Sequence, residues 1–475
     1  MIPEALLVLA LILVFVGDFC LHKSERRNSV LSKLTTALLL CQIIIMTTVS
    51  PAEAFGGMYV ATQAANVMKI ILTLGTLVVV IMAQPWLERE AQRLTGEFYL
   101  LVLSTLLGMY VMTSSGNFLM FFLGLETASV PMACLVAFDK FKKNSAEGAA
   151  KYILTATFSS GVMLYGISFV YAAVGTLYFD DVAQRIVFFS QFKSQMPLLL
   201  MGLVFFFSGL GFKLSLVPFH FWTADTYEGA PTPVTGYLSV VSKGAAAFAL
   251  MVILARAFAP LTEYWEYLLY IVIVLSITVA NLFAIRQSEL KRFMAFSSIS
   301  QAGYIMLAVI GASQTGMASL MYYVLVYVVA NMAVFTVIST VEQNNGGTTA
   351  MSSYDGLYQT NPRLAFLMTL ALFSLAGIPP FAGMFSKFFV FMAAAQQGSF
   401  WAYFVVFIAL INTVVSLYYY LLIVKAMYIK QTDTPLPAFK TEFSTRVALA
   451  VCTAGIVLFG VCSCIYDWLF AASAL

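Results

Sequence analysis

Fourteen apolar stretches, each long enough to form a membrane-spanning helix, follow one another along the whole chain. A helix of about 20 apolar residues spans the hydrocarbon core of a bilayer. Inside that core the chain must satisfy its own backbone polar groups, and a helix does so within one segment. The sequence therefore predicts an all-α polytopic membrane protein with about 14 transmembrane helices. The stretches lie near residues 3–21, 31–50, 66–86, 98–114, 117–138, 150–175, 197–219, 235–257, 264–285, 294–311, 316–341, 363–395, 400–428 and 446–470.

The composition excludes a soluble domain. Of the 475 residues, 61% are hydrophobic and only 10% are charged, whereas a soluble domain carries about 25% charged residues. A formal net charge of +3 indicates no nucleic-acid surface, so we expect a lipid bilayer around the chain and no nucleic-acid partner. The first apolar stretch is predicted to be a retained helix, because Glu4 precedes it and basic residues follow it, the reverse of a signal peptide.

Basic residues gather in alternate loops, and this alternation predicts the orientation. The intervening loops are poor in charge, apart from one loop of mixed sign with Asp180 and Lys193. Since basic loops remain in the cytoplasm, both termini are predicted on the opposite side of the membrane. The basic residues of the alternate loops are Lys23, Arg26, Arg27, Lys33, Arg89, Arg93, Lys140, Lys142, Lys143, Arg286, Lys291, Arg292, Lys430, Lys440 and Arg446.

The cysteines and histidines do not suit a redox centre. An iron–sulfur cluster needs about four thiolates, and a haem held between helices needs facing histidines. The six cysteines form no C-x-x-C pair, and only two histidines are present. Cys462 and Cys464, one residue apart, are interpreted as packing residues. We therefore expect no metal and no cofactor bound by this chain.

Five charged residues lie deep inside the apolar stretches. A charge near the bilayer centre costs about 2.5 to 3.5 kcal/mol on insertion scales, so such residues indicate function. Without a cluster of metal ligands, lysines and a carboxylate indicate a relay of protonatable groups, because a desolvated lysine exchanges protons near neutral pH. Lys69 and Lys425, close to helix ends, are instead predicted to extend to the membrane interface. The five residues are Glu126, Lys151, Lys213, Lys243 and Lys387.

Several of these residues have two interpretations. A lysine beside Glu126 would keep it ionised, and we expect Lys213 there; a static ion pair that fixes packing is the alternative. Lys151 and Glu147 share a helix face, so they form either a local surface pair or a pair that tunes Glu126 or Lys213. His220 either takes up protons or caps a helix end.

Prolines interrupt two stretches, at Pro218 and at Pro379-Pro380. A broken helix is tolerated in a membrane where its backbone is buried in protein or lines a polar cavity. Breaks at corresponding places in two halves are typical of inverted-repeat transporters. Asp225 and Glu228, which follow the first break, are predicted to be solvated loop acids or caps. The predicted units are residues 1–96 with three helices, repeat 97–258 with helices 4–8, inverted repeat 259–430 with helices 9–13, and 431–475 with helix 14.

Five segments together resemble one family, the subunit N family of bacterial proton-pumping NADH:quinone oxidoreductase, respiratory complex I. Lys387 in the twelfth helix, the sequence YEGAPTPV, and the lack of a lateral helix after the last span favour it over larger antiporter-like subunits. The segments are GLGFKLSLVPFHFWTADTYEGAPTPVT (209–235) with Ser242-Lys243, FLGLETASVP around Glu126, AAKYILTATFSSG around Lys151, ELKRFMAFSSISQAGY (289–304) and SLAGIPPFAGMFSKFF (374–389).

The resemblance implies two inverted five-helix repeats, each a half-channel, joined by a central polar axis. It implies that Glu126 and Lys213 form the first-half pair, that Lys243 is the central link and that Lys387 is the terminal group of the second half. Protons would pass from cytoplasm to periplasm through this relay, driven by quinone reduction in other subunits.

The family also implies the surroundings of the chain. NADH, FMN, iron–sulfur clusters and quinone would be bound by other subunits, so the chain would be a non-redox subunit of the translocase, without catalysis in isolation. Its partners would be other membrane subunits of complex I, including antiporter-like ones, in a bacterial inner membrane with both termini periplasmic.

Two departures from the family and two other functions stay open. Ala224 stands where the family has proline, and Gln301 where many relatives have histidine, so another group or water must serve in the tenth helix. A subunit of a multi-subunit Na+/H+ antiporter is the alternative function, and a passive scaffold is the third.

Overall fold

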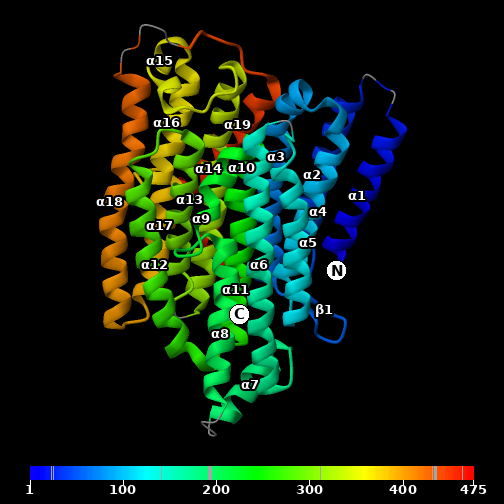
Figure 1. Cartoon of the computed structure of the whole chain (residues 1–475), viewed down its shortest axis with the longest axis vertical. Helices are drawn as coiled ribbons and strands as arrows, with labels where there is room; N and C mark the ends of the chain where they lie inside the picture. The colour runs from blue at the N-terminus through cyan, green and yellow to red at the C-terminus, as the bar shows by residue number, and fades with distance from the viewer. Residues whose placement is uncertain are drawn as a thin grey trace.

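The computed structural model describes residues 1–22, 24, 26–140, 142–190, 195–310, 312–430, 432, 436–462 and 464–474. It is a bundle of long helices that run along one common direction (Figure 1). Twelve of the described helices are long and apolar enough to cross a membrane. With α13 (Leu290–Leu307) and the consecutive short helices α16 (Pro362–Ala376) and α17 (Ala382–Ala395), they match the fourteen predicted stretches. The all-α prediction is confirmed.

The N-terminal unit begins with two helices that keep much of their surface exposed, as expected for helices that are apolar all round. A short antiparallel hairpin, not predicted from the sequence, joins them to a third helix that is largely buried. The Thr62 side chain caps this third helix by accepting a hydrogen bond from the Ala65 N–H at 3.1 Å. The elements are α1 (Ile2–Cys20), α2 (Arg27–Met46), β1 (Ala52–Ala54), β2 (Tyr59–Ala61), α3 (Gln63–Glu90) and η1 (Gln92–Leu94).

The first repeat follows, packed through small residues. A Cβ added at Gly108 would lie 2.3 Å from the Ala128 backbone nitrogen, so glycine lets α4 and α5 approach closely. The loop expected before the broken helix contains the amphipathic helix α7, which buries Phe179, Val182 and Ile186. The elements are α4 (Thr95–Thr113), α5 (Phe118–Val136), α6 (Lys143–Val174), α7 (Phe179–Ser190), α8 (Met196–Leu214), α9 (Phe221–Gly229), α10 (Thr232–Tyr237), η2 (Leu238–Ser242) and α11 (Lys243–Arg256).

The second repeat contains α14, whose apolar window is completely buried because helices of the other units, including α3, α10 and α19, also pack against it. In Figure 1 the second repeat and the N-terminal unit occupy opposite edges of the bundle, marked by α18 and α1. The remaining elements are η3 (Ala259–Leu261), α12 (Thr262–Ala284), α14 (Gln314–Asn344), η4 (Met351–Tyr354), α15 (Leu357–Thr360), α18 (Phe400–Tyr428), α19 (Phe443–Val461) and α20 (Cys464–Ala472).

Both predicted helix breaks are present, and both begin in the same way. Helix α8 ends at Leu214, and Ser215 adopts a left-handed φ of 61° before α9 starts. Helix α16 ends at Ala376, and Gly377 adopts a left-handed φ of 89° before α17 starts. The prediction of one continuous last helix is wrong, because Cys462 leaves the helical conformation and α19 and α20 are separate helices.

Candidate functional site

Three lysines are buried in the middle of the bundle with closely similar surroundings. The exposed fractions of Lys213, Lys243 and Lys387 are 5%, 1% and 4%. Each ammonium group lies over a tyrosine ring, at 5.8, 5.5 and 4.9 Å from its centroid, respectively. Among the described residues none of the three forms an ion pair. Aromatic faces and hydroxyls thus stabilise these cations without fixing them to a carboxylate.

Lys213 does not contact Glu126. Its Nζ donates to the Ser129 hydroxyl at 2.8 Å and to the Tyr152 hydroxyl at 3.1 Å. Glu126 lies one helical turn before Ser129 on α5, and its Oε1 is buried without a partner in the described structure. The expected Glu126–Lys213 ion pair is therefore not formed, because two hydroxyls of α5 and α6 take up the lysine.

Lys243 begins α11, directly after the irregular π-helical turn η2. Its Nζ donates to the Ser298 hydroxyl of α13 at 2.5 Å. The same hydroxyl lies 3.0 Å from the Tyr227 hydroxyl of α9. Hydrogen bonds through Ser298 therefore connect Lys243 on α11 and Tyr227 on α9 with α13 of the second repeat.

The Pro379-Pro380 break creates the polar surroundings of Lys387. Prolines have no N–H, so the carbonyls four residues earlier, those of Leu375 and Ala376, lack a helical donor. Lys387 Nζ donates to the Ala376 carbonyl at 2.9 Å. Gln301 Nε2, from α13, donates to the Leu375 carbonyl at 3.3 Å. The free Ala376 carbonyl thus binds the terminal lysine, Lys387. The free Leu375 carbonyl binds Gln301, which stands where many relatives have histidine.

A small cavity of about 10 Å³ connects Gln301 with Lys387, which is about the space of one water molecule. The Tyr323 hydroxyl donates to Gln301 Oε1, and Gln301 Nε2 also donates to the Tyr420 hydroxyl at 3.3 Å. Tyr327 lines the same cavity, and its buried hydroxyl has no partner in the described residues. This polar link lies between the central and the terminal lysine.

Gly377 makes room for Lys387. Its φ of 89° is left-handed, and an added Cβ would lie 3.1 Å from Lys387 Cδ. Only glycine adopts this conformation without strain and also leaves the lysine stem its space.

Lys151 belongs to an ion-pair network at the surface rather than to the buried series. Its Nζ pairs with Glu147 at 2.8 Å and with Asp225 at 2.6 Å. Arg292 pairs with Asp225 at 2.8 Å and with Glu228 at 2.7 Å. The sequence predicted that Asp225 and Glu228 are solvated loop acids or caps. Instead, both lie on α9 and form ion pairs that join it to α6 and α13. With side chains 31–56% exposed, each pair contributes little stability.

His220 lies between α8 and α9, and its exposed fraction is 8%. Its ring lies 4.5 Å from the Phe221 ring, and Nδ1 has no partner among the described residues. It therefore does not contact the buried lysines in this structure.

A cavity of about 510 Å³ opens where the two repeats meet, near the predicted cytoplasmic loops. Lys142 lies at its rim and pairs with Asp139 at 2.8 Å and with Glu90 at 3.2 Å. Burial opposes the charged form of Lys142, but hydrogen bonding to Asp139 and the charge of Glu90 raise its pKa overall. The ionisable residues of the lining are Glu90, Asp139, Lys142, Lys143, Glu228, Glu289, Lys291 and Glu342.

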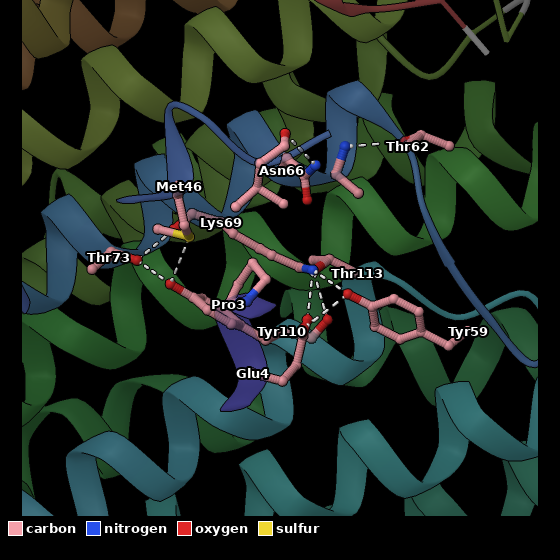
Figure 2. Close-up of polar contacts among 12 residues, drawn as sticks. Pro3, Glu4, Met46, Tyr59, Thr62, Asn66, Lys69, Thr73, Tyr110 and Thr113 are labelled. Atoms are coloured by element: carbon pink, nitrogen blue, oxygen red, sulfur yellow. Dashed lines mark hydrogen bonds and ion pairs between the residues drawn. The ribbon is translucent and has the colours of Figure 1, made fainter. Parts of the chain in front are cut away.

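The sequence predicted that Lys69 extends to the membrane interface, but it does not. It is completely buried and forms an ion pair with Glu4 at 2.6 Å (Figure 2). The prediction was wrong because the N-terminal helix brings a carboxylate to α3. Lys425, by contrast, is exposed in the last turn of α18, and its extension to the membrane interface stays a prediction.

Comparison with known proteins places the chain in a family. The family model described as "NADH:quinone oxidoreductase/Mrp antiporter, TM" matches residues 115–414. The NADH-quinone oxidoreductase subunit N of Phocaeicola vulgatus is 58% identical over 467 residues, 98% of this chain and 96% of that protein. The subunit N of Azobacteroides pseudotrichonymphae is 50% identical over 474 residues, 98% and 96% of the two chains. This chain belongs to the NADH:quinone oxidoreductase/Mrp antiporter family.

Solved structures of the family have the same fold. A chain of respiratory complex I from Thermus thermophilus is 30% identical with a TM-score of 0.77, and the match covers 97% of each chain. A chain of the Mrp complex from a Dietzia species is only 18% identical, yet its TM-score is 0.82, with 100% and 97% of the two chains covered. The second likeness concerns the fold alone.

Sequence reasoning found the buried lysines of this family member but missed their neighbours. Ser129, Tyr152, Ser298 and Tyr323 hold the site together. A usable signal existed for one of them, because Ser129 lies three residues after Glu126 on the same helix face. Among the described residues no group of three His, Cys, Asp or Glu side chains could hold a metal ion.

Proposed function

We propose that this chain is a proton-translocating membrane subunit of an NADH:quinone oxidoreductase. The observation that carries the proposal is the series of three buried lysines without carboxylate partners in the described structure. Hydroxyls, a backbone carbonyl and aromatic faces hold these lysines, and none of these groups carries the full negative charge of a carboxylate. Such lysines accept and release protons, whereas a lysine locked to a carboxylate stays charged.

Protons enter through the charged cavity between the repeats. Its rim carries carboxylates and lysines, and its lining includes Ala230 and Thr232, directly after α9. Lys291 Nζ donates to the Ala230 carbonyl at 2.7 Å, so polar contacts continue into the bundle. Tyr227 on α9 then leads to Ser298 and Lys243. The cavity lining includes Ala230 but not Tyr227, Ser298 or Lys243, so the proposed path continues through the hydrogen bonds of these three side chains.

Gln301 and water carry the proton from the central region to Lys387. The amide itself does not titrate, but it binds the hydroxyls of Tyr323 and Tyr420, and Gln301 and Tyr323 line a cavity of about 10 Å³. Buried polar groups without protein partners commonly bind ordered water, and the Tyr327 hydroxyl is one such group. A water bound there completes a hydrogen-bonded path to Lys387.

Glu126 and Lys213 form the beginning of the relay in the first repeat, although they are not in contact. Lys213 is held by Ser129, one turn from Glu126. Glu126 is only half-buried, so a neighbouring subunit can approach it. Lys151 and His220 stay as auxiliary candidates, Lys151 because it precedes Tyr152, and His220 because its Nδ1 is free to bind a water molecule.

The surroundings of the chain follow from the same proposal. Its partners are the other membrane subunits of the complex, including antiporter-like subunits. NADH, FMN, iron–sulfur clusters and quinone are bound by other subunits, so the isolated chain has no redox activity. The complex lies in a bacterial inner membrane, and both termini of the chain are periplasmic.

A purification tests this proposal. The tagged chain, solubilised in a mild detergent, should co-migrate with NADH dehydrogenase activity in a complex of several subunits. The family description also names Mrp antiporters, which supports the second candidate, a subunit of a Na+/H+ antiporter. Co-migration with membrane subunits only, in vesicles that exchange Na+ for H+, would replace the first proposal by the second.

A further inference from the structure

Another buried lysine, Lys69, lies outside the segment that the family model matches. Lys69, on α3, precedes the matched residues 115–414 and is completely buried. Figure 2 shows it pointing toward Glu4 of α1 and Tyr59 of β2. Lys69 Nζ lies 2.6 Å from Glu4 Oε1 and donates to the Tyr59 hydroxyl at 3.1 Å. The Tyr59 hydroxyl donates to Glu4 Oε2 at 2.9 Å, which closes a triangle of hydrogen bonds.

On the side facing the interior of the bundle, the contacts of this triangle lead through Tyr110. The Lys69 ammonium also lies 5.6 Å from the centre of the Tyr110 ring. The Tyr110 hydroxyl contacts the Thr73 hydroxyl and donates to the sulfur of Met46 at 3.4 Å. The Met46 sulfur is a weak acceptor that does not transfer protons. Lys69 thus differs from the three relay lysines because a carboxylate holds it.

A buried ion pair fixes the relative position of the elements that carry it. Taking two charges out of water is costly, and a buried pair is a poor source of stability compared with apolar residues. Loss of one partner, however, leaves an uncompensated buried charge and is strongly destabilising. Such a pair therefore admits one relative position of the elements that carry it. Here it sets the position of α1 and β2 relative to α3.

Helix α3 in turn packs against the turn that precedes Lys243. A Cβ added at Gly75 of α3 would lie 2.7 Å from Val241 Cγ2, within η2. A Cβ added at Gly244, the residue after Lys243, would lie 3.3 Å from Met68 Cε, on α3. Close packing of this kind leaves no space for α3 to shift without moving η2. An irregular π-helical turn depends on such neighbours, because its hydrogen bonding is less regular than that of an α-helix.

We propose that Glu4 and Lys69 are positioning residues: their ion pair fixes α3 to α1 and β2, and α3, which packs against η2, thereby orients Lys243. The N-terminal unit then serves the relay as a rigid support and carries no protons itself. This inference rests on the proposed role of Lys243.

Four variants in the intact complex test it. Glu4→Gln and Lys69→Met each remove one charge, and the triple variant Glu4→Leu, Tyr59→Phe, Lys69→Met removes the whole polar triangle. Arg89→Gln is the matched control, because Arg89 lies on the same helix and pairs with Glu442 at 2.6 Å in an exposed position. Two quantities are measured in membranes: the amount of assembled complex, and the protons pumped per NADH oxidised by that complex.

Each single variant should lower the assembled complex by roughly tenfold. The complex that remains should pump at most about half the protons per NADH, because a displaced η2 misorients Lys243. The triple variant should restore both quantities to within about twofold, and Arg89→Gln should leave both unchanged.

Three results would overturn the inference. Single variants that equal the control would show that the pair positions nothing. Single variants that assemble poorly but pump normally per complex would show a purely stabilising pair. A triple variant that assembles but does not pump would make Lys69 part of the relay. Lys243→Met separates this inference from the proposed function: if that variant pumps normally, the proposed relay itself fails.

Discussion

Replacing Gln301 by leucine would remove the polar link between the central and terminal lysines while nearly preserving volume. Tyr420 would keep its contact with the Ser297 hydroxyl at 2.5 Å. The Tyr323 hydroxyl and the Leu375 carbonyl would both lose their partner. Each orphaned buried group costs about 1 to 3 kcal/mol, so the variant should lose roughly 2 to 6 kcal/mol of interaction energy.

Part of this loss should appear as slower proton transfer. If only about 1.4 kcal/mol raises the barrier of the transfer step, pumping falls about tenfold. The assay is proton uptake into inside-out membrane vesicles driven by NADH, normalised to the amount of assembled complex. Gln301→His is the matched control, because imidazole keeps a donor and an acceptor, and it should retain most of the pumping. A leucine variant that pumps as fast as the unmodified complex would refute the reasoning, since the link would then carry no protons.

Three further substitutions have distinct expected outcomes. Gly377→Ala places a side chain in a left-handed position and against Lys387; it should cost about 1 to 2 kcal/mol and lower both the thermal midpoint of the complex and its pumping rate. Lys213→Arg should reduce pumping more than about tenfold with normal assembly, because arginine does not release its proton, and full activity would show that only charge matters. Arg292→Gln should cost at most about 1 kcal/mol, because its pair with Asp225 is partly exposed; pumping below half would make this network part of the relay.

The sequence predicted the architecture because lipid leaves a chain few choices. Length and apolarity alone located the spans, and prolines located both helix breaks. The same signals did not predict the structure of two segments that were expected to be loops. These segments form the hairpin β1–β2 and the amphipathic helix α7. The signals also failed at Cys462, which leaves the helical conformation where the last predicted helix divides into α19 and α20.

The candidate site was predicted only in part, because contacts between distant helices decide it. Lys213, Lys243 and Lys387 stood out by their charge in apolar surroundings, and all three are buried. Their partners are serines and tyrosines, which are common in membrane helices and carry no comparable signal. Lys69 was misassigned for a related reason: its distance from a helix end says nothing of the carboxylate that another helix brings to it. Helix packing, not local sequence, determines these pairings.

The central claim is that Lys243 carries protons between the two repeats. The most direct measurement is the number of protons pumped per NADH oxidised by an assembled complex that contains Lys243→Met. Methionine keeps the apolar stem and removes the titratable group, so the account predicts normal assembly with at most about half the normal number of protons pumped per NADH. An assembled variant that pumps the normal number of protons per NADH would contradict it.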